Sequence, residues 1–342
     1  MNVPNSSMPH QTRKALVIGI TGQDGAYLAA HLLELGYQVF GSSRDARPSS
    51  MSGLQWLRIA NRIQVVQMAP SDFRSVIQTI ANIMPDEIYN LSGQSSVAVS
   101  FSQPIETLES VIVATGNLLE AIRFLGLEKT TRFYNACSSE CFGDTGGAPA
   151  DEYTPFHPHS PYAVAKAGAY WLVANYRSAY GLFACSGILF NHESPLRPER
   201  FVTRKIVSAA VRIAAGSDER LKLGNIEIER DWGWAPEYVD AMRRMLQIDC
   251  PQDFVVATGR TVSLRYFIES CFAQLGLDWQ RYVESDPSLL RPSDMKISRA
   301  DPSLAERVLG WRATVFVEGV ISRLIEHERG CQDSGDVNLP ST

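Results

Sequence analysis

Three glycines spaced three residues apart, between a short apolar run and an amphipathic stretch, constrain the fold of this chain more than any other feature. Residues 15–20 are apolar and suit a buried strand, and residues 27–35 carry apolar side chains at helical spacing. The glycines between them permit a tight turn and a close approach of the backbone to a ligand. Glycines alone could form a merely structural turn, but a strand, turn and helix in this order present backbone N–H groups to a pyrophosphate. The stretch therefore predicts a dinucleotide-binding turn made of Gly19, Thr21, Gly22, Gln23, Asp24 and Gly25.

Strand-like and helix-like segments continue to alternate through the first 190 residues. Further strands are expected at residues 37–40, 63–67, 87–91, 132–136 and 182–190, and helices at 71–83, 104–125 and around 160–166. Such alternation specifies a parallel sheet with helices on both faces. The predicted fold class is α/β, a Rossmann-type doubly wound parallel sheet with a smaller, irregular C-terminal substrate lobe.

The alternation weakens after residue 190, where prolines and a charged stretch at residues 218–230 interrupt it. This change in pattern gives the expected boundaries of the domains. They are a disordered leader at residues 1–13, a nucleotide-binding body at 14–190, a mainly substrate-binding lobe with returning sheet elements at 191–330, and a loose tail at 331–342.

Composition narrows the function classes. The 342-residue chain has a net charge of -5 and no block of Lys or Arg, which argues against nucleic acid as the main partner. No apolar run approaches the roughly eighteen residues that a membrane span needs. The six cysteines include no Cys-x-x-Cys pair, which favours reduced thiols and a cytoplasmic protein. Cys137 and Cys141 could suggest a metal pair, but no second pair accompanies them, so no metal is expected.

The end of the second predicted strand bears on the choice of cofactor. An acid there would hold a ribose 2′-hydroxyl, whereas a base would accommodate a 2′-phosphate. The sequence after Phe40 has no acid at the expected position and offers Arg44, with Arg47 nearby. This favours NADP, while the adjacent Asp45 leaves NAD open and both arginines could be solvated loop charges.

Four reactive side chains lie at the end of the strand predicted at 132–136 and in the helix predicted around 160–166. Tyr162 and Lys166 are four residues apart, so on a helix they share one face, and the ammonium would lower the pKa of the phenol. Ser138 and Glu140 follow the apolar run and would reach a cleft at the carboxyl end of the sheet. Tyr-x-x-x-Lys also occurs in helices where the tyrosine is half buried and the lysine is solvated. Its combination with the glycine turn favours a catalytic role for the four side chains.

Longer strings carry a resemblance to a known family. The chain is similar to the GDP-mannose 4,6-dehydratases, within the extended short-chain dehydrogenase/reductase superfamily of nucleotide-sugar modifying enzymes. The matching strings are residues 19–28, 154–156, 160–166, 187–195, 201–205 and 230–233, and the similarity runs from about Lys14 to Trp311. The sequence departs from the family pattern at Ala69-Pro70, at Ser138 in place of a threonine and at Asp294 in place of a glutamate.

The resemblance implies NADP-dependent dehydration of GDP-mannose to GDP-4-keto-6-deoxymannose. It implies that Tyr162 takes the proton of the C4 hydroxyl while hydride leaves for the nicotinamide, and that Lys166 holds the nicotinamide ribose. Glu140 would then remove the acidified C5 proton, Ser138 would assist loss of water at C6, and hydride would return to C6. The resemblance further assigns Leu91, Gln94, Ser95, His192 and Arg197 to the cofactor. It assigns Asn191, Val202, Lys205, Arg230, Arg291 and Asp294 to the GDP-sugar.

Two other functions remain open at this point. One is a ketoreductase or epimerase of GDP-deoxysugars, and the other is a non-catalytic NADP-binding regulator. Glu140 argues against a simple reductase, which needs no base at C5, and an intact Tyr162 and Lys166 argue against a regulator. The resemblance also implies a homo-oligomer, a dimer or a tetramer.

Overall fold

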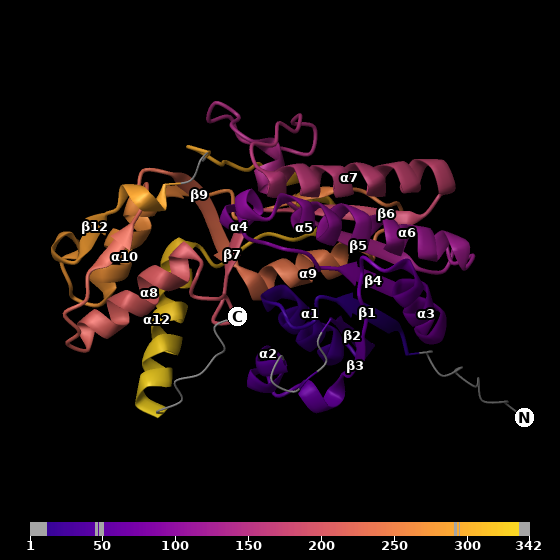
Figure 1. Ribbon diagram of the computed structural model, residues 1–342, viewed down its shortest axis with the longest axis horizontal. Coiled ribbons are helices and arrows are strands. Elements are labelled where there is room, and N and C mark those ends of the chain that lie inside the picture. The colour runs from indigo at the N-terminus through magenta and orange to yellow at the C-terminus, as the bar shows by residue number, and fades with distance from the viewer. Residues whose placement is uncertain (1–11, 45–46, 48–50, 291–292, 294, 335–342) are drawn as a thin grey trace, which may run out of the picture.

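The structure is a computed structural model that describes residues 12–44, 47, 51–290, 293 and 295–334 (Figure 1). Its main feature is a seven-stranded sheet in the order β10-β6-β5-β4-β1-β2-β3, with every neighbouring pair parallel. These strands are β1 (Lys14–Ile18), β2 (Gln38–Ser43), β3 (Gln64–Gln67), β4 (Glu87–Asn90), β5 (Arg132–Ser138), β6 (Phe183–Leu189) and β10 (Phe254–Val256). The parallel α/β fold expected from the sequence is confirmed.

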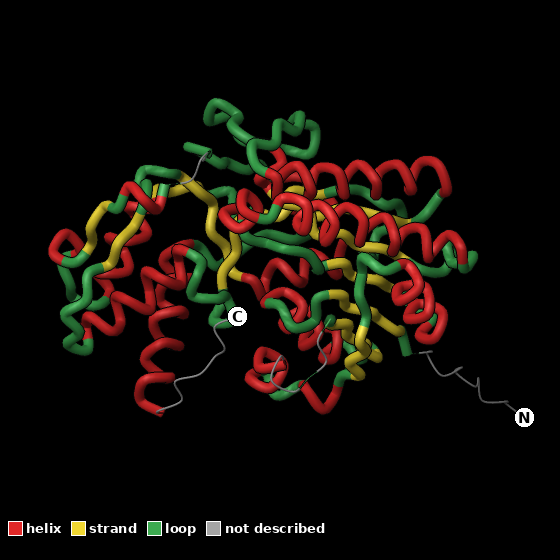
Figure 2. The backbone as a smooth tube through the Cα atoms, in the orientation of Figure 1, coloured by secondary structure: helices red, strands yellow, loops and turns green. Residues whose placement is uncertain are grey.

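Helices cover both faces of this sheet (Figure 2). Alternate residues of β1 show why, because successive side chains of a strand point to opposite faces. Ala15 and Val17 belong to the core shared with α1 (Gln23–Glu34), α9 (Ala235–Met245) and α11 (Ser303–Leu309). Leu16 and Ile18 belong to the core shared with α3 (Phe73–Ile83), α6 (Ala114–Phe124) and α7 (Pro161–Tyr180). A strand buried on both faces therefore reads as a continuous apolar run.

A smaller lobe packs beside the carboxyl-terminal end of the sheet and lies at the left of Figure 1. Its core includes Trp232, Phe267 and Leu324 and lies among α8 (Val202–Ala214), α10 (Leu264–Gln274) and α12 (Val317–Ser334). One small sheet has the order β11-β9-β7, and another pairs β12 with β8. Their bounds are β7 (Asn191–Glu193), β8 (Leu221–Leu223), β9 (Glu229–Trp234), β11 (Thr261–Ser263) and β12 (Val283–Ser285). Late segments also return to the body, where β10 pairs with β6 and α9 packs against α1.

The first strand and the helix predicted at 104–125 differ locally from expectation. β1 stops at Ile18, because Gly19 adopts a φ of 84° and turns the chain. The segment expected as one helix consists of α5 (Pro104–Leu108), a π-helical turn η3 (Glu109–Val113) and α6. A π-turn has a wider hydrogen-bond spacing, which apolar periodicity does not reveal.

Several short elements were not predicted, because they are too short to show a periodicity. They are α2 (Ser52–Trp56), α4 (Val97–Ser102) and the 3-10 turns η2 (Ala60–Arg62), η4 (Ser139–Phe142), η5 (Trp279–Arg281) and η6 (Pro287–Leu289). At the other end of the chain, α12 extends to Ser334, past residue 331 where a loose tail was expected. Among the described helices, none is both long and apolar enough to cross a membrane.

Candidate active site

The glycine turn joins β1 to α1 at the carboxyl end of the sheet. Gly22 donates its N–H to the carbonyl of Gly19 at 3.0 Å, and an added Cβ at Gly25 would overlap that same carbonyl oxygen. Gly22 is the N-cap of α1 and provides no side-chain cap, while Thr21 lies partly buried in the turn. Backbone N–H groups of an uncapped first turn suit an anion, so these residues fit the pyrophosphate of a dinucleotide.

Asp24 in this turn forms a pair with His192, which follows β6. His192 Nε2 lies 3.0 Å from Asp24 Oδ2, its Nδ1 lies 2.7 Å from the Phe190 carbonyl, and its ring stacks on Tyr238. Burial opposes the charge on each partner, but their mutual attraction and hydrogen bond prevail and lower the pKa of Asp24 to about 2. The same attraction raises the pKa of His192. Gln23 adds a hydrogen bond to Asp24 at 3.0 Å, so the predicted cofactor residues Gln23, Asp24 and His192 form one network.

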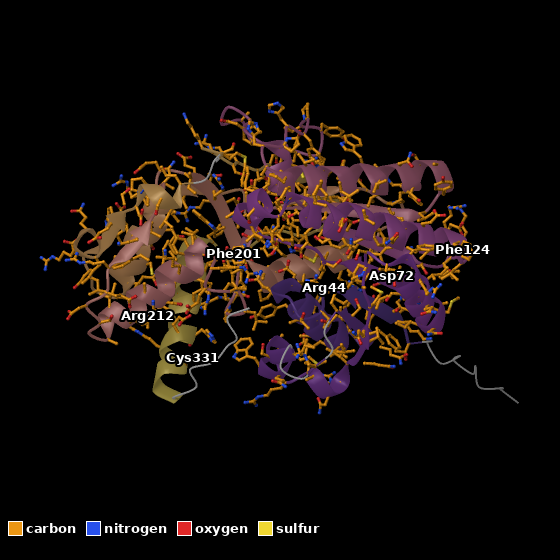
Figure 3. The ribbon with its side chains drawn as sticks, viewed as in Figure 1. Arg44, Asp72, Phe124, Phe201, Arg212 and Cys331 are labelled. Atoms are coloured by element: carbon orange, nitrogen blue, oxygen red, sulfur yellow. The ribbon has the colours of Figure 1, made fainter. Side chains whose placement is uncertain are left out.

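The residues predicted to select the cofactor lie at the end of β2. Arg44 is exposed directly after this strand, and Figure 3 places it in the body of the molecule. Its carbonyl accepts a hydrogen bond from Gln67 Nε2 at 3.3 Å, which ties the loop to the edge strand β3. Arg47 is also exposed, and Asp45 lies outside the described residues. At the departure from the family pattern, the Pro70 carbonyl accepts a hydrogen bond from Asn117 Nδ2 at 3.0 Å.

Leu91, Gln94 and Ser95 follow β4, the strand next to β1. Leu91 donates its N–H to the Ile18 carbonyl at 3.0 Å, which holds this loop against the glycine turn. The Gln94 side chain is engaged with Ser96 and Thr107, and Ser95 is exposed. The structure therefore brings this segment beside the turn, as the dinucleotide assignment requires.

The four predicted catalytic side chains come together where β5 ends and α7 begins. Ser138 is the last residue of β5, and its hydroxyl accepts the Glu140 N–H at 3.3 Å. The same hydroxyl lies near the phenol of Tyr162 and acts to lower its pKa. Lys166 lies one turn further along α7 and donates to the Ala136 carbonyl at 2.8 Å. Ser138, Tyr162 and Lys166 are buried, and Glu140 is partly buried.

The expected lowering of the phenol pKa is wrong for the protein by itself. Burial raises the pKa of Tyr162; the nearby Ser138 hydroxyl opposes this rise, and the charge of Glu140 adds to it. Burial likewise lowers the pKa of Lys166, whose Nζ lies 5.9 Å from the centroid of the tyrosine ring. The physical reason is that desolvation outweighs the attraction that helical spacing suggests.

Cys137 and Cys141 lie beneath this site. Their Sγ atoms are 3.6 Å apart, and they face the carbonyls of Lys166 and Ala163 at 3.9 and 3.6 Å. Burial raises the pKa of the Cys141 thiol, which disfavours the thiolate that a metal or an oxidant needs. Within the part of the chain that the structure describes, no group of three or more His, Cys, Asp or Glu side chains could hold a metal ion.

Residues 143–160, the connecting loop, link η4 to α7 and so join Glu140 to Tyr162. Gly143 has a φ of 64°, and a Cβ there would overlap the carbonyl of His157. The helix after the loop is well defined, because Ser160 caps α7 by accepting the Ala163 N–H at 3.1 Å and Pro161 occupies its first turn. The position of Tyr162 is therefore set both by the cap and by the close loop.

The described residues among those assigned to the GDP-sugar lie on the smaller lobe. Asn191 opens β7, which pairs in parallel with β9, and the buried Arg230 of β9 donates to the carbonyls of Glu229 and Lys296 at 2.9 and 3.5 Å. Val202 begins α8 without a side-chain cap before it, and Lys205 donates to the Lys222 carbonyl at 2.7 Å. Arg291 and Asp294 lie outside the described residues.

Glu193 and Arg200 lie near this site and were not predicted from the sequence. Glu193 is buried, accepts the Thr203 hydroxyl at 2.7 Å and lies 3.5 Å from the Arg197 guanidinium, which it therefore helps to orient. Arg197 also stacks 3.7 Å over Phe201, which Figure 3 shows at the start of α8. Arg200 is a further cation here, and burial followed by the charge of Arg197 lowers its pKa. The signal was present in the sequence, since Glu193 adjoins His192 and the two arginines are three residues apart.

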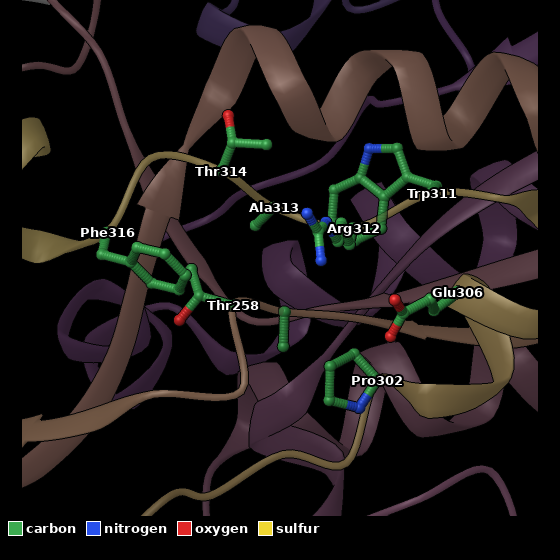
Figure 4. A pocket seen from close by; sticks show the side chains of 9 residues that line it. Thr258, Pro302, Glu306, Trp311, Arg312, Ala313, Thr314 and Phe316 are labelled. Atoms are coloured by element: carbon green, nitrogen blue, oxygen red, sulfur yellow. The ribbon is translucent and has the colours of Figure 1, made fainter.

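A cavity of about 400 Å³ lies elsewhere, between α11 and the segment that precedes α12 (Figure 4). It is lined by Ala257, Thr258, Pro302, Glu306, Trp311, Arg312, Ala313, Thr314 and Phe316. None of these residues belongs to the predicted site, so the cavity is separate from the chemistry described above.

Known proteins that are similar to this chain identify its family. The family model of GDP-mannose 4,6 dehydratase matches residues 16–324. The chain belongs to the GDP-mannose 4,6-dehydratase family. The protein named GDP-mannose 4,6 dehydratase 2 of Arabidopsis thaliana is 43% identical over 332 residues, which cover 95% of this chain and 89% of the relative. The predicted resemblance and the predicted enzyme class, a hydro-lyase, are thereby confirmed.

Solved structures of more distant proteins share the fold. The dTDP-glucose 4,6-dehydratase of Bacillus anthracis in complex with NAD matches with a TM-score of 0.81 at 16% identity, covering 94% of this chain and 98% of that one. RMD from Pseudomonas aeruginosa, complexed with NADPH, matches with a TM-score of 0.77 at 21% identity, covering 93% and 99%. At these identities the likeness concerns the fold, and it extends over both the body and the smaller lobe.

Proposed function

We propose that this enzyme catalyses the NADP-dependent dehydration of GDP-mannose to GDP-4-keto-6-deoxymannose. The observation that carries the proposal is the meeting of Ser138, Glu140 and Tyr162 at the carboxyl end of β5, with Lys166 one turn along α7. A reductase would need the phenol and the amine, whereas a carboxylate beside them supplies the base for an elimination. Family membership over most of the chain supports the same substrate.

The glycine turn, the loop after β4 and the His192–Arg197 segment are the groups that would hold the cofactor. The uncapped N-terminus of α1 suits the pyrophosphate, and Arg44 at the end of β2 suits a 2′-phosphate. Solved neighbours in complex with NAD and with NADPH support a nicotinamide dinucleotide. A bound nicotinamide would supply what the side chains lack, since it can accept hydride from the C4 carbon and return it to C6.

The side chains would divide the proton transfers between them. Tyr162 accepts the proton of the C4 hydroxyl, and the nearby Ser138 hydroxyl favours the phenolate. Once C4 is a ketone the C5 proton is acidic, and Glu140 removes it. Ser138 then hydrogen bonds with the C6 hydroxyl as this leaves as water. The two protons taken up by Tyr162 and Glu140 balance the reaction, because one leaves with the C6 hydroxyl and the other goes to C5 when hydride returns to C6. Lys166 lies close enough to hold a ribose and to favour the phenolate electrostatically.

The smaller lobe would bind the GDP moiety. The uncapped first turn of α8 at Val202 offers N–H groups to a diphosphate, and Arg230 and Lys205 offer charge. Arg230 is held by two backbone carbonyls, so its guanidinium is already oriented before a ligand arrives. Asn191, Arg291 and Asp294 complete the proposed contacts to the sugar nucleotide.

We also propose a cytoplasmic homo-oligomer, a dimer or a tetramer. Exposed apolar side chains on neighbouring helices support an interface between copies, namely Ile105, Val113 and Phe124 along α5 to α6 and Val164 and Trp171 on α7. The six free cysteines suit a reducing compartment.

The experiment is incubation of the purified chain with GDP-mannose and NADP, followed by mass spectrometry of the sugar nucleotide. We expect a product lighter than the substrate by one water and no net consumption of NADP. A product that has gained or lost two hydrogens without loss of water would identify a reductase or dehydrogenase instead. Unchanged GDP-mannose in the presence of demonstrable substrate binding would contradict the proposal.

A further inference from the structure

Residues 295–301 form a segment that lies beside the start of strand β9 in the proposed substrate lobe. The Glu229 N–H donates to the Lys296 carbonyl at 2.7 Å, and the Ser298 N–H donates to the Glu229 carbonyl at 3.0 Å. These bonds make a parallel bridge between Glu229 and Ile297. The segment is therefore fixed to the residue that directly precedes Arg230.

The same segment also holds the connecting loop, residues 143–160. The Ala150 N–H donates to the Arg299 carbonyl at 2.9 Å, and the Asp301 N–H donates back to the Ala150 carbonyl at 2.9 Å. Ala150 and Ala300 are both buried at this second bridge. One short segment thus lies between a strand that carries a proposed phosphate ligand and the loop that joins Glu140 to Tyr162.

The side chain of Arg299 also joins β9 to the connecting loop, at the surface of the protein. Its Nη2 lies 3.2 Å from Glu229 Oε2, and its Nη1 donates to the Gly147 carbonyl at 3.4 Å. The Arg299 side chain is 45% exposed and the Glu229 side chain 32%, so the pair contributes little to stability by itself. Its planar fork, however, fixes two partners from different parts of the chain at once.

The Arg230 side chain contacts the same backbone groups that hold residues 295–301 against β9. Its Nη1 donates to the Glu229 carbonyl and to the Lys296 carbonyl, which are the two backbone groups that join β9 to the segment. A shift of β9 on binding a diphosphate would therefore move residues 295–301, and through Ala150 and Gly147 it would move the connecting loop.

We infer that Arg299 is a positioning residue that couples the substrate strand β9 to the connecting loop, and so aligns Glu140 with Tyr162 when GDP-mannose binds. The inference rests on the proposed function. Because Arg230 keeps its backbone partners without the Arg299 side chain, binding of the substrate is retained when this side chain is removed. The backbone bonds of Ala150 also remain, but the loop at Gly147 loses its tie to Glu229. The reacting groups are then less well aligned, and a displacement of the order of 1 Å lowers a rate by up to about a hundredfold.

Steady-state kinetics of Arg299→Ala, Arg299→Lys and Glu229→Gln test this coupling. We expect kcat to fall about tenfold in Arg299→Ala with KM changed by less than about twofold, and a partial recovery in Arg299→Lys, which reaches one partner but not both. Glu229→Gln should lower kcat similarly, and the double variant should lose no more than either single one. The matched control is Arg265→Ala, which breaks the comparably exposed Arg265–Glu227 pair on the same lobe, away from the loop.

Hydrogen–deuterium exchange of residues 144–157 gives a readout that does not depend on turnover. GDP-mannose should slow exchange there in the wild type and in Arg265→Ala, and it should slow it much less in Arg299→Ala. Equal protection in all three proteins, or a KM rise with kcat unchanged, would overturn the inference. A wild type that binds GDP-mannose but does not dehydrate it would refute the proposed function, whereas the exchange comparison would still decide the coupling.

Discussion

Two polar centres at the carboxyl end of the same sheet differ in whether a neighbouring charge or burial decides the pKa of their side chains. In the glycine turn, Asp24 and His192 pair at 3.0 Å, and each stabilises the charge of the other against burial. At the β5–α7 corner, burial raises the pKa of Tyr162 and lowers that of Lys166, so desolvation weakens the charged form of each group. In the first centre, each charge therefore has an opposite charge as its partner within the chain. In the second, desolvation is the largest influence on the pKa of both groups, and pKa values perturbed in this way are typical of catalytic sites.

Removal of the phenol should have the largest effect on rate. Tyr162→Phe removes the proposed base at C4, and loss of such a group lowers turnover by about a hundred- to ten-thousandfold. Thermal stability should be kept, because the lost hydroxyl was buried in its uncharged form. Turnover of GDP-mannose and a thermal melt measure both effects.

Tyr176→Phe is the control, since Tyr176 lies on the same helix and donates its hydroxyl to Glu120 at 2.9 Å, away from the site. Activity of Tyr162→Phe at the level of this control would remove the phenol from the mechanism.

Glu140→Gln separates elimination from oxidation within the same centre. We expect GDP-mannose and NADP to bind and the dehydrated product to fall about a hundredfold or more, because an amide cannot remove the C5 proton. Exchange of the C5 hydrogen with deuterated solvent, followed by mass spectrometry, should be lost together with the product. A variant that melts normally and dehydrates GDP-mannose at near wild-type rate would show that another group is the C5 base.

Asp24→Asn breaks the Asp24–His192 pair, and it should lower the free energy of unfolding by an amount that depends on pH. The lowered pKa of Asp24 contributes stability above about pH 4 that is lost as the pH falls toward about 2, and this is worth about 2 kcal/mol. The raised pKa of His192 contributes stability below about pH 6.5 that is lost as the pH rises through the folded value. Urea unfolding should therefore show the variant most destabilised near pH 5.5 and less so near pH 8.5.

A difference between wild type and Asp24→Asn that is the same at both pH values would mean that the pair is not charged in the folded protein.

Arg44→Ala should have the smallest effect, because it leaves both centres intact. NADPH should bind more tightly than NADH to the wild type by about tenfold, the value of a charge-assisted contact with a 2′-phosphate. The variant should narrow this ratio and leave NADH affinity and the melting temperature unchanged. Equal dissociation constants for the two cofactors in the wild type, measured by calorimetry, would contradict the assignment of Arg44.

The sequence was informative where local pattern and burial agree. Continuous apolar runs predicted β1, β5 and β6, and the glycines marked the turn after β1. The three-residue strand β10 was not predicted, because Phe254–Val256 is too short to show a pattern and its place is set by pairing with β6. The spacing of Tyr162 and Lys166 correctly predicted a shared helix, but not the sign of the phenol pKa, because desolvation depends on the whole surrounding core. Arg299 had no local signal, since its partners Glu229 and Gly147 lie far away in the sequence.

The return of β10 to the sheet has a consequence for how the chain is made. Synthesis delivers residues 14–190 first, and at that stage β6 forms an open edge with unpaired backbone groups. The face of α1 that packs on α9 is also still bare. Such an edge is a site where nascent chains adhere to one another, so chaperone binding should be strongest in this interval. After Phe254–Val256 leaves the ribosome, the edge of β6 is replaced by the three-residue edge of β10, and so short an edge is a poor template for pairing with another chain.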